Sequence, residues 1–154
     1  KKNTNLRIHS ACFTWDIFHS EKCDCGEQLN DSLEYMIKNG GGVILYLDQE
    51  GRGIGLANKM RAYSLQSKGL DTIDADNNIG FLDDERDFAV ATKILSLLKI
   101  KQVNVITNNF SKMASLKKAG IRVMKQINTK PTINKFNKNY FETRYKKTGY
   151  DFKI

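Results

Sequence analysis

The chain has 154 residues, of which 40% are hydrophobic and 27% are charged, as in an ordinary globular protein. No apolar run is long enough to span a membrane, which excludes a membrane protein, and the absence of a secretion signal favours a cytoplasmic one. The formal net charge of +8 indicates an anionic ligand, such as a nucleotide or a nucleic acid, without choosing between them. We expect a single domain over residues 1–154.

The first predicted strand, Leu6 to Ser10, leads into a loop that holds every cysteine of the chain, namely Cys12, Cys23 and Cys25. Zinc prefers four tetrahedral ligands, so three thiolates leave one position open, as in catalytic sites. The spacing equally allows a closed structural site with His9 or His19 as the fourth ligand. The odd number of cysteines argues against disulfides, and the polar surroundings argue against a role as buried apolar filler.

A glycine-rich turn is the second candidate site. The apolar spacing after Gly26 predicts a helix that ends at residues 39–42, and the apolar run over 42–47 predicts a buried strand. The turn over 48–55 follows this strand and precedes a predicted helix over 56–68. Such a turn can offer backbone N–H groups to a phosphate, although an ordinary loop fits the same residues. The charged Glu50 and Arg52 within it favour the phosphate.

The second half of the chain repeats the alternation of strands and helices. Residues 70–81 are polar and irregular, which indicates an active-site or surface loop. A helix is predicted to open with the acidic run Asp83 to Asp87, where the acids could simply cap it. A strand over 102–107, a helix over 111–119 capped by Ser111, a strand over 121–124 and a basic helix over 137–147 follow.

This alternation predicts an α/β fold, with a mixed sheet and flanking helices. Ligands of such sheets bind at the carboxyl ends of the strands. We therefore expect Arg7 and His9, the turn with Glu50 and Arg52, and residues 107–109 to meet on one rim beside the cysteine loop. This set of groups is typical of zinc-assisted hydrolysis of a phosphorylated substrate.

Seven segments, in the same order along the chain, resemble the GTP cyclohydrolase II family. They are Arg7 to Ser10 with Cys12, Cys23 to Leu29, Gln49 to Arg52, Ile54 to Leu56, Asn58 to Tyr63, Asp84 to Phe88, and Thr107 to Asn109. The resemblance implies a zinc enzyme of riboflavin biosynthesis that opens the imidazole ring of GTP at C8. Formate is released, and pyrophosphate is removed with the assistance of Mg²⁺. It also implies a homodimer, and nucleic acid is not the expected partner.

The resemblance assigns roles to individual residues. It implies zinc ligation by the three cysteines, a proton acceptor at Asp84, a nucleophile or α-phosphate stabiliser at Arg86, and a role in ring opening for Tyr63. Since guanidinium stays protonated, Arg86 is better suited to hold a phosphate than to attack it. The implied substrate-binding residues are Arg7, Ile8, His9, Ser10, Ala11, Gln28, Glu50, Gly51, Arg52, Thr72, Thr107 and Lys112.

The chain departs from the family pattern at four positions. Ala11 stands where glutamate is usual, Trp15 replaces a glycine, Asp48 replaces an arginine, and Phe110 replaces a proline. The N-terminal β segment of the family is absent or not shown, and residues 131–154 form a basic C-terminal segment. These departures motivate two alternatives, which are a cyclohydrolase with a different product or purine nucleotide and a non-catalytic homologue that binds nucleotide or RNA.

Overall fold

The computed structural model describes residues 3–148, which divide between two units. One unit, here the sheet unit, comprises residues 3–9, Glu27–Leu47 and Asp87–Pro131. The other, here the cysteine unit, comprises Ser10–Gly26, Asp48–Arg86 and residues 132–148. The chain passes between the units several times, and the expectation of a single domain over residues 1–154 stays a prediction.

The sheet unit is built on four strands. The strands are β1 (Thr4–Ser10), β2 (Val43–Leu47), β3 (Gln102–Ile106) and β4 (Arg122–Ile127), and their order across the sheet is β2-β1-β3-β4. The pairs β1–β3 and β3–β4 are both parallel. The predicted α/β class is therefore confirmed. A mixed sheet was expected, but the two strand pairs whose registers are described are both parallel.

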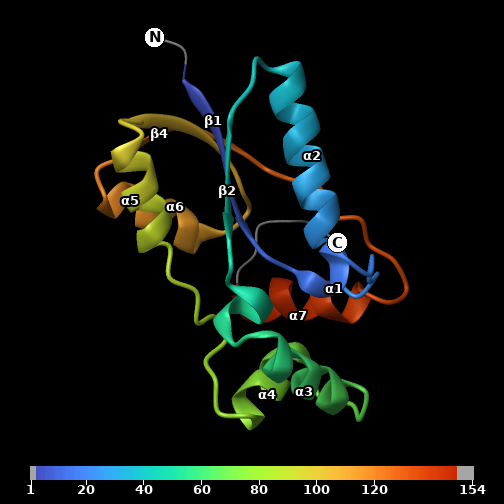
Figure 1. Cartoon of the computed structure of the whole chain (residues 1–154). Helices are drawn as coiled ribbons and strands as arrows, with labels where there is room; N and C mark the ends of the chain where they lie inside the picture. The colour runs from blue at the N-terminus through green and yellow to red at the C-terminus, as the bar shows by residue number, and fades with distance from the viewer. Residues whose placement is uncertain (1–2, 149–154) are drawn as a thin grey trace. The chain divides into compact units, whose positions relative to one another are not determined.

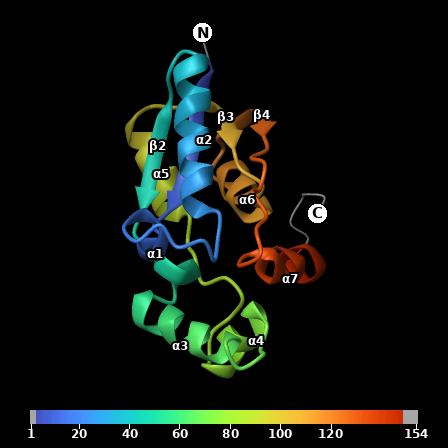
Figure 2. The same cartoon turned by 90° about the vertical axis from the view of Figure 1, so that its right-hand side faces the viewer.

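Helices cover both faces of this sheet. Figures 1 and 2 show α2 (Cys25–Lys38) on one side of β1 and β2, with α5 (Ala89–Leu97) and α6 (Phe110–Lys118) on the other side. The core between the strands and helices consists of aliphatic side chains and one aromatic ring. Its buried members are Leu6, Ile8, Leu45, Leu47, Phe88, Ala91, Leu95, Val103, Val105, Leu116 and Ile121.

The cysteine unit is built from short helices. They are α1 (Phe13–Asp16), the 3₁₀ turn η1 (Glu50–Gly53), α3 (Leu56–Gln66), α4 (Thr72–Asn78) and α7 (Lys138–Thr148). Helices α3 and α4 lie side by side in Figures 1 and 2. Helix α7 confirms the predicted basic helix, while the last residues of the predicted basic C-terminal segment, 149–154, lie outside the described residues.

The interpretation of residues 70–81 as an irregular loop is wrong, because α4 forms within them. The side chain of Asp71 caps this helix by accepting hydrogen bonds from the backbone N–H groups of Ile73 and Asp74. Ile73 and Ala75 are buried, so the helix has an apolar face despite its polar composition. Burial of only two apolar side chains was too weak a pattern to predict a helix.

Two predicted helix starts are also wrong. The acidic run 83–87 does not form the first turn of α5, because this helix begins at Ala89. The Asp87 carboxylate instead accepts a hydrogen bond from the Ala89 N–H group. Helix α6 is capped by Asn109 and not by Ser111, because the Asn109 side chain accepts from the Ser111 N–H group. Among the described helices, none combines the length and the apolar character needed to cross a membrane.

Helix α5 offers a matched test of the core. Leu95 is fully buried in the core cluster, whereas Leu97, two residues further on, is 71% exposed. We expect Leu95→Ala to lower the free energy of unfolding by about 2–5 kcal/mol, because it removes buried methyl groups and leaves a cavity. Leu97→Ala should change it by less than about 0.5 kcal/mol. Urea denaturation measures both values, and equal losses would contradict the described packing.

Candidate functional site

The cysteine loop is folded onto itself by short-range hydrogen bonds. The Cys12 carbonyl accepts from the N–H groups of Trp15 and Asp16 at 2.9 and 2.7 Å, which forms the turn α1. The Asp16 carboxylate accepts in return from the Cys12 N–H group at 3.0 Å. Cys25 begins α2, so two of the three cysteines lie at the ends of helices.

The three sulfur atoms form a group that could hold a metal ion. All of them lie within 4.8 Å of one another, and the Sγ atoms of Cys12 and Cys23 are 3.6 Å apart. Tetrahedral thiolates around zinc stand about 3.8 Å apart, given Zn–S bonds of about 2.3 Å. The group includes no histidine, and the ring of His19 packs edge-on against Trp15 instead. The geometry therefore favours the open site over the closed one with His19.

The protons on the three thiols are unequally held. Hydrogen bonds from Cys23 and Cys25, aided by the charge of Lys59, outweigh burial and hold the pKa of Cys12 well below its ordinary value. The hydrogen bond to Cys12, followed by burial, raises the pKa of Cys23 to about 12. The same causes raise the pKa of Cys25 well above its ordinary value. The contact with Lys59 thus favours deprotonation of Cys12, and a divalent cation would favour deprotonation of all three.

Lys59 of α3 lies directly against this group. Its Nζ atom donates to Cys12 Sγ at 3.2 Å, to Thr14 Oγ1 at 2.7 Å and to Glu50 Oε1 at 2.7 Å. Burial alone would lower the pKa of Lys59, but its electrostatic interactions with Tyr63, Cys12 and Glu50 raise it above its ordinary value. Lys59 is therefore a permanent cation in contact with the cysteine loop.

Glu50 connects the glycine-rich turn to the same loop. Beyond its ion pair with Lys59, its carboxylate accepts from the N–H groups of Gly51 and Phe13. The backbone of Gly51 and Arg52 lies in the left-handed region, at φ 59° and 62°. This conformation suits glycine but is uncommon for arginine, and strain of this kind clusters at functional sites.

Arg52 is held by two further groups of the cysteine unit. Its guanidinium forms an ion pair with Asp76 of α4 and donates to the Asp83 carbonyl at 2.8 Å. Asp76 is 2% exposed, and burial raises its pKa although Arg52 opposes this. The ion pair thereby fixes the strained turn to α4.

Asp84 and Arg86 pair with each other through two parallel hydrogen bonds. Arg86 Nε donates to Asp84 Oδ1 at 2.7 Å, and Arg86 Nη2 donates to Oδ2 at 2.5 Å. Partial burial would raise the pKa of Asp84, but the Arg86 guanidinium outweighs it and lowers that pKa below its ordinary value. The predicted proton acceptor and the predicted phosphate-binding residue are thus each other's partners.

Tyr63 lies one helical turn after Lys59 on α3. The ammonium groups of Lys22 and Lys59 lie 4.5 and 5.7 Å from the centre of its ring. Burial raises the pKa of Tyr63 to about 12, although Lys59 opposes the shift. Its hydroxyl group therefore keeps its proton at neutral pH.

In the sheet unit, three predicted substrate-binding residues meet. Arg7 Nη2 donates to Gln28 Oε1 at 2.8 Å and lies 3.3 Å from His9 Nδ1, while Nη1 donates to the Ile106 carbonyl at 3.2 Å. The His9 ring stacks on Tyr46, with ring centres 5.6 Å apart. Arg7 and His9 both belong to β1 and are almost fully buried, so this cluster lies within the folded sheet unit.

Two other predicted residues of the sheet unit form hydrogen bonds with the backbone. The buried Lys112 donates to the Ile8 carbonyl at 2.8 Å, and its ammonium lies 5.4 Å from the centre of the Phe88 ring. Thr107 Oγ1 accepts from the Asn109 N–H group, which shapes the turn after β3. The predicted site residues thus belong to both units, and their expected meeting on one rim stays a prediction.

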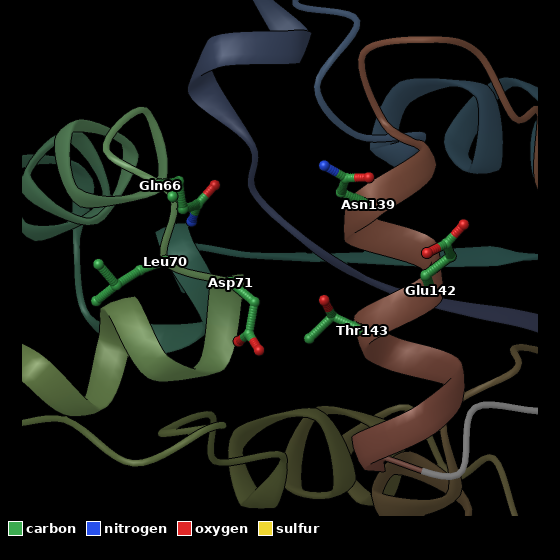
Figure 3. A pocket seen from close by; sticks show the side chains of 7 residues that line it. Gln66, Leu70, Asp71, Asn139, Glu142 and Thr143 are labelled. Atoms are coloured by element: carbon green, nitrogen blue, oxygen red, sulfur yellow. The ribbon is translucent and has the colours of Figure 1, made fainter.

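The remaining predicted residues belong to the cysteine unit. Ser10 and Ala11 precede Cys12 and are partly exposed, and Thr72 is the first residue of α4. Thr72 lies next to Asp71, which lines a cavity of about 300 Å³ between α7 and the α3–α4 connection (Figure 3). Glu142 also lines this cavity, so the cavity is lined by two carboxylates. Their negative charge would repel a triphosphate.

Lys59 and Asp76 belong to the candidate site but were not among the residues predicted from the sequence. Lys59 lies within the Asn58 to Tyr63 segment, and its spacing of four residues from Tyr63 places both on one side of a helix. That spacing was a usable signal. Asp76 carried none, because its segment was not predicted to be helical.

Comparisons with known proteins give one consistent result. A protein-family model described as GTP cyclohydrolase II matches residues 1–128. A GTP cyclohydrolase-2 from Psychromonas ingrahamii is 50% identical over 94% of this chain and 72% of that protein. A GTP cyclohydrolase-2 from Vibrio parahaemolyticus is 46% identical over 97% of this chain and 75% of that protein. A riboflavin biosynthesis protein RibBA from Staphylococcus saprophyticus is 48% identical over 97% of this chain, which spans 38% of that longer protein.

The Asp84–Arg86 pair predicts a specific pH dependence. Because the folded pKa of Asp84 is lowered, the pair stabilises the fold above the unfolded pKa of about 3.9. This stability is lost as the pH falls through the folded pKa. In urea denaturation, the difference between wild type and Asp84→Asn should be largest near neutral pH and shrink below about pH 4.

Glu34→Gln is the matched control for this measurement. It breaks the ion pair between Glu34 and Lys38, whose side chains are 68% and 72% exposed respectively. Solvent screens such a pair, so its effect should be small at every pH. A difference for Asp84→Asn that did not vary with pH would contradict the pairing.

Proposed function

The chain belongs to the GTP cyclohydrolase II family, a family of hydrolases, and we propose that it opens the imidazole ring of GTP at C8. Formate and pyrophosphate are the released products. The observation that carries this proposal is the group of three sulfur atoms within the matched residues. The name of the RibBA relative supports a place in riboflavin biosynthesis.

We assign Cys12, Cys23 and Cys25 as the ligands of one zinc ion. The separation of their sulfur atoms suits tetrahedral zinc, and three ligands leave a position for water or substrate. When bound, zinc supplies a Lewis acid that polarises the substrate and makes water more acidic. Three thiolates make the centre formally anionic, which weakens that acidification, so a neighbouring proton acceptor becomes useful.

Asp84 is the proposed proton acceptor, and its pairing with Arg86 suggests how it is activated. While the pair is intact, the lowered pKa makes the Asp84 carboxylate a weak base. A phosphate group of GTP competes for the Arg86 guanidinium, because both anions offer it two oxygen atoms. Transfer of Arg86 to the phosphate would raise the pKa of Asp84 and strengthen it as a base. Substrate binding and base activation are then a single event.

Other charged residues serve the triphosphate and the base of GTP. The Arg7 cluster with Gln28 and His9 and the turn with Arg52 are the proposed recognition elements, with Mg²⁺ accompanying the phosphates. Tyr63 keeps its proton at neutral pH and is suited to donate a hydrogen bond or a proton during ring opening. The family resemblance further supports a homodimer.

The experiment that tests the proposal is product identification. The full chain is incubated with GTP, Zn²⁺ and Mg²⁺, and formate, pyrophosphate and the pyrimidine product are followed by enzymatic assay and mass spectrometry. Release of both small products supports the proposed reaction. GTP binding without release of either product would overturn it in favour of a non-catalytic homologue.

Two variants separate the metal ligands from the proton acceptor. We expect Cys23→Ser to lose zinc and turnover together, because it removes one of three ligands. Asp84→Asn should keep its zinc and lose about 10²–10⁴-fold in kcat, the usual contribution of a general base. Zinc content by atomic absorption and initial rates check both. A fully active Cys23→Ser protein would show that the metal assignment is wrong.

One observation favours a second candidate function, in which the hydrolase makes a different product or uses another purine nucleotide. A Cβ atom built on Gly26 would lie 1.6 Å from Cε3 of Trp15, so the indole ring lies directly on the Gly26 backbone, beside Cys25. The family pattern has glycine in place of Trp15. Mass spectrometry of the products from GTP, ATP and ITP, for wild type and Trp15→Gly, distinguishes this candidate from the first.

A further inference from the structure

We propose that Lys59 is a positioning residue of the metal site, whose ammonium group holds the Cys12 thiolate and locks the cysteine loop to the glycine-rich turn. The inference rests on the proposed function, since it takes the three cysteines to be metal ligands. It concerns only residues of the cysteine unit.

The first support is the match between donors and acceptors. An ammonium group has three N–H bonds, and the Lys59 ammonium has three acceptors, at Cys12 Sγ, Thr14 Oγ1 and Glu50 Oε1. Two of these belong to the cysteine loop and one to the turn. The remaining oxygen of Glu50 accepts from the Phe13 N–H group, which returns to the loop. Lys59 and Glu50 thus bond to each other, and together they bond to the three consecutive residues Cys12, Phe13 and Thr14.

The second support is the burial of the charge. The Lys59 side chain is 11% exposed and that of Glu50 is 9% exposed. Burying an ammonium group costs stability unless it is paired, and Glu50 provides that pairing. The ion pair with Glu50 already offsets the cost of burying the charge, and an exposed lysine would not incur that cost at all. Stability therefore does not explain the additional contact between the Lys59 ammonium and the Cys12 sulfur atom.

The third support is the effect of such a contact on a thiolate ligand. A hydrogen bond from a cation to sulfur draws electron density away from it, and outer contacts of this kind orient ligands and tune the metal. Lys59 fixes the position of the Cys12 sulfur atom, and loss of such an orienting contact weakens metal binding. Its loss should also alter the electronic properties of the sulfur ligands.

Cobalt substitution tests the inference without reference to activity. The chain of 154 residues, loaded with Co²⁺, is expected to show sulfur-to-cobalt charge-transfer absorption. In Lys59→Met we expect this band to move to longer wavelength, because the unbonded thiolate donates charge more readily. Zinc affinity, measured by competition with a chromogenic chelator, should fall by about 10–100-fold. Lys59→Arg keeps a cation and should recover part of both properties.

Lys68→Met is the matched control, because it makes the same replacement at an exposed position just after α3. It should leave the band and the zinc affinity unchanged. If Lys59→Met shows an unshifted band and wild-type zinc affinity, the proposed role of Lys59 is wrong, but the metal site itself is not contradicted. Failure of the wild-type chain to bind Co²⁺ through sulfur would overturn the metal site, and with it the proposed function. A general loss of folding would appear in circular dichroism and would lower affinity in Lys59→Arg equally, which would also overturn the inference.

Discussion

The Lys59 ammonium joins the cysteine loop to the glycine-rich turn through its contacts with Cys12, Thr14 and Glu50. A buried cation must have partners, and these partners come from two segments that are far apart in sequence. The turn with Glu50 can reach its left-handed backbone only where surrounding contacts outweigh the strain, and Lys59 and Asp76 supply those contacts. The proposed metal loop and the proposed phosphate turn are therefore parts of one electrostatic arrangement.

The same principle governs the other charged residues of the candidate site. Arg52 pairs with Asp76, Arg86 with Asp84, and Arg7 with Gln28. Each cation is held in a defined position and is already stabilised by a neighbour, so a phosphate must displace or share that neighbour. Binding of an anion would therefore free the partner side chain, and would change the pKa of that partner where it is a carboxylate. In the proposed reaction, this coupling connects recognition of the phosphate to the basicity of Asp84.

The parts of the fold that were predictable have strong local patterns. Strand β2 is an unbroken apolar run, and α2 repeats apolar residues at helical spacing up to a glycine cluster, so periodicity was sufficient. Helix α4 was missed because its stability comes from the Asp71 cap and from two buried apolar residues. The start of α5 was misplaced because Asp84 and Arg86 bond to each other and do not form a first helical turn.

The α/β alternation, the three cysteines as a candidate metal-binding set, and the family could all be predicted from the sequence, because they depend on residue type and spacing along the chain. The pairing of charges could not, since ion pairs such as Lys59–Glu50 and Arg52–Asp76 join residues of different elements. Their partners are selected by burial, which makes an unpaired charge costly, and burial is a property of the folded chain. The candidate metal ligands could thus be identified from the sequence, whereas the cation that contacts one of them could not.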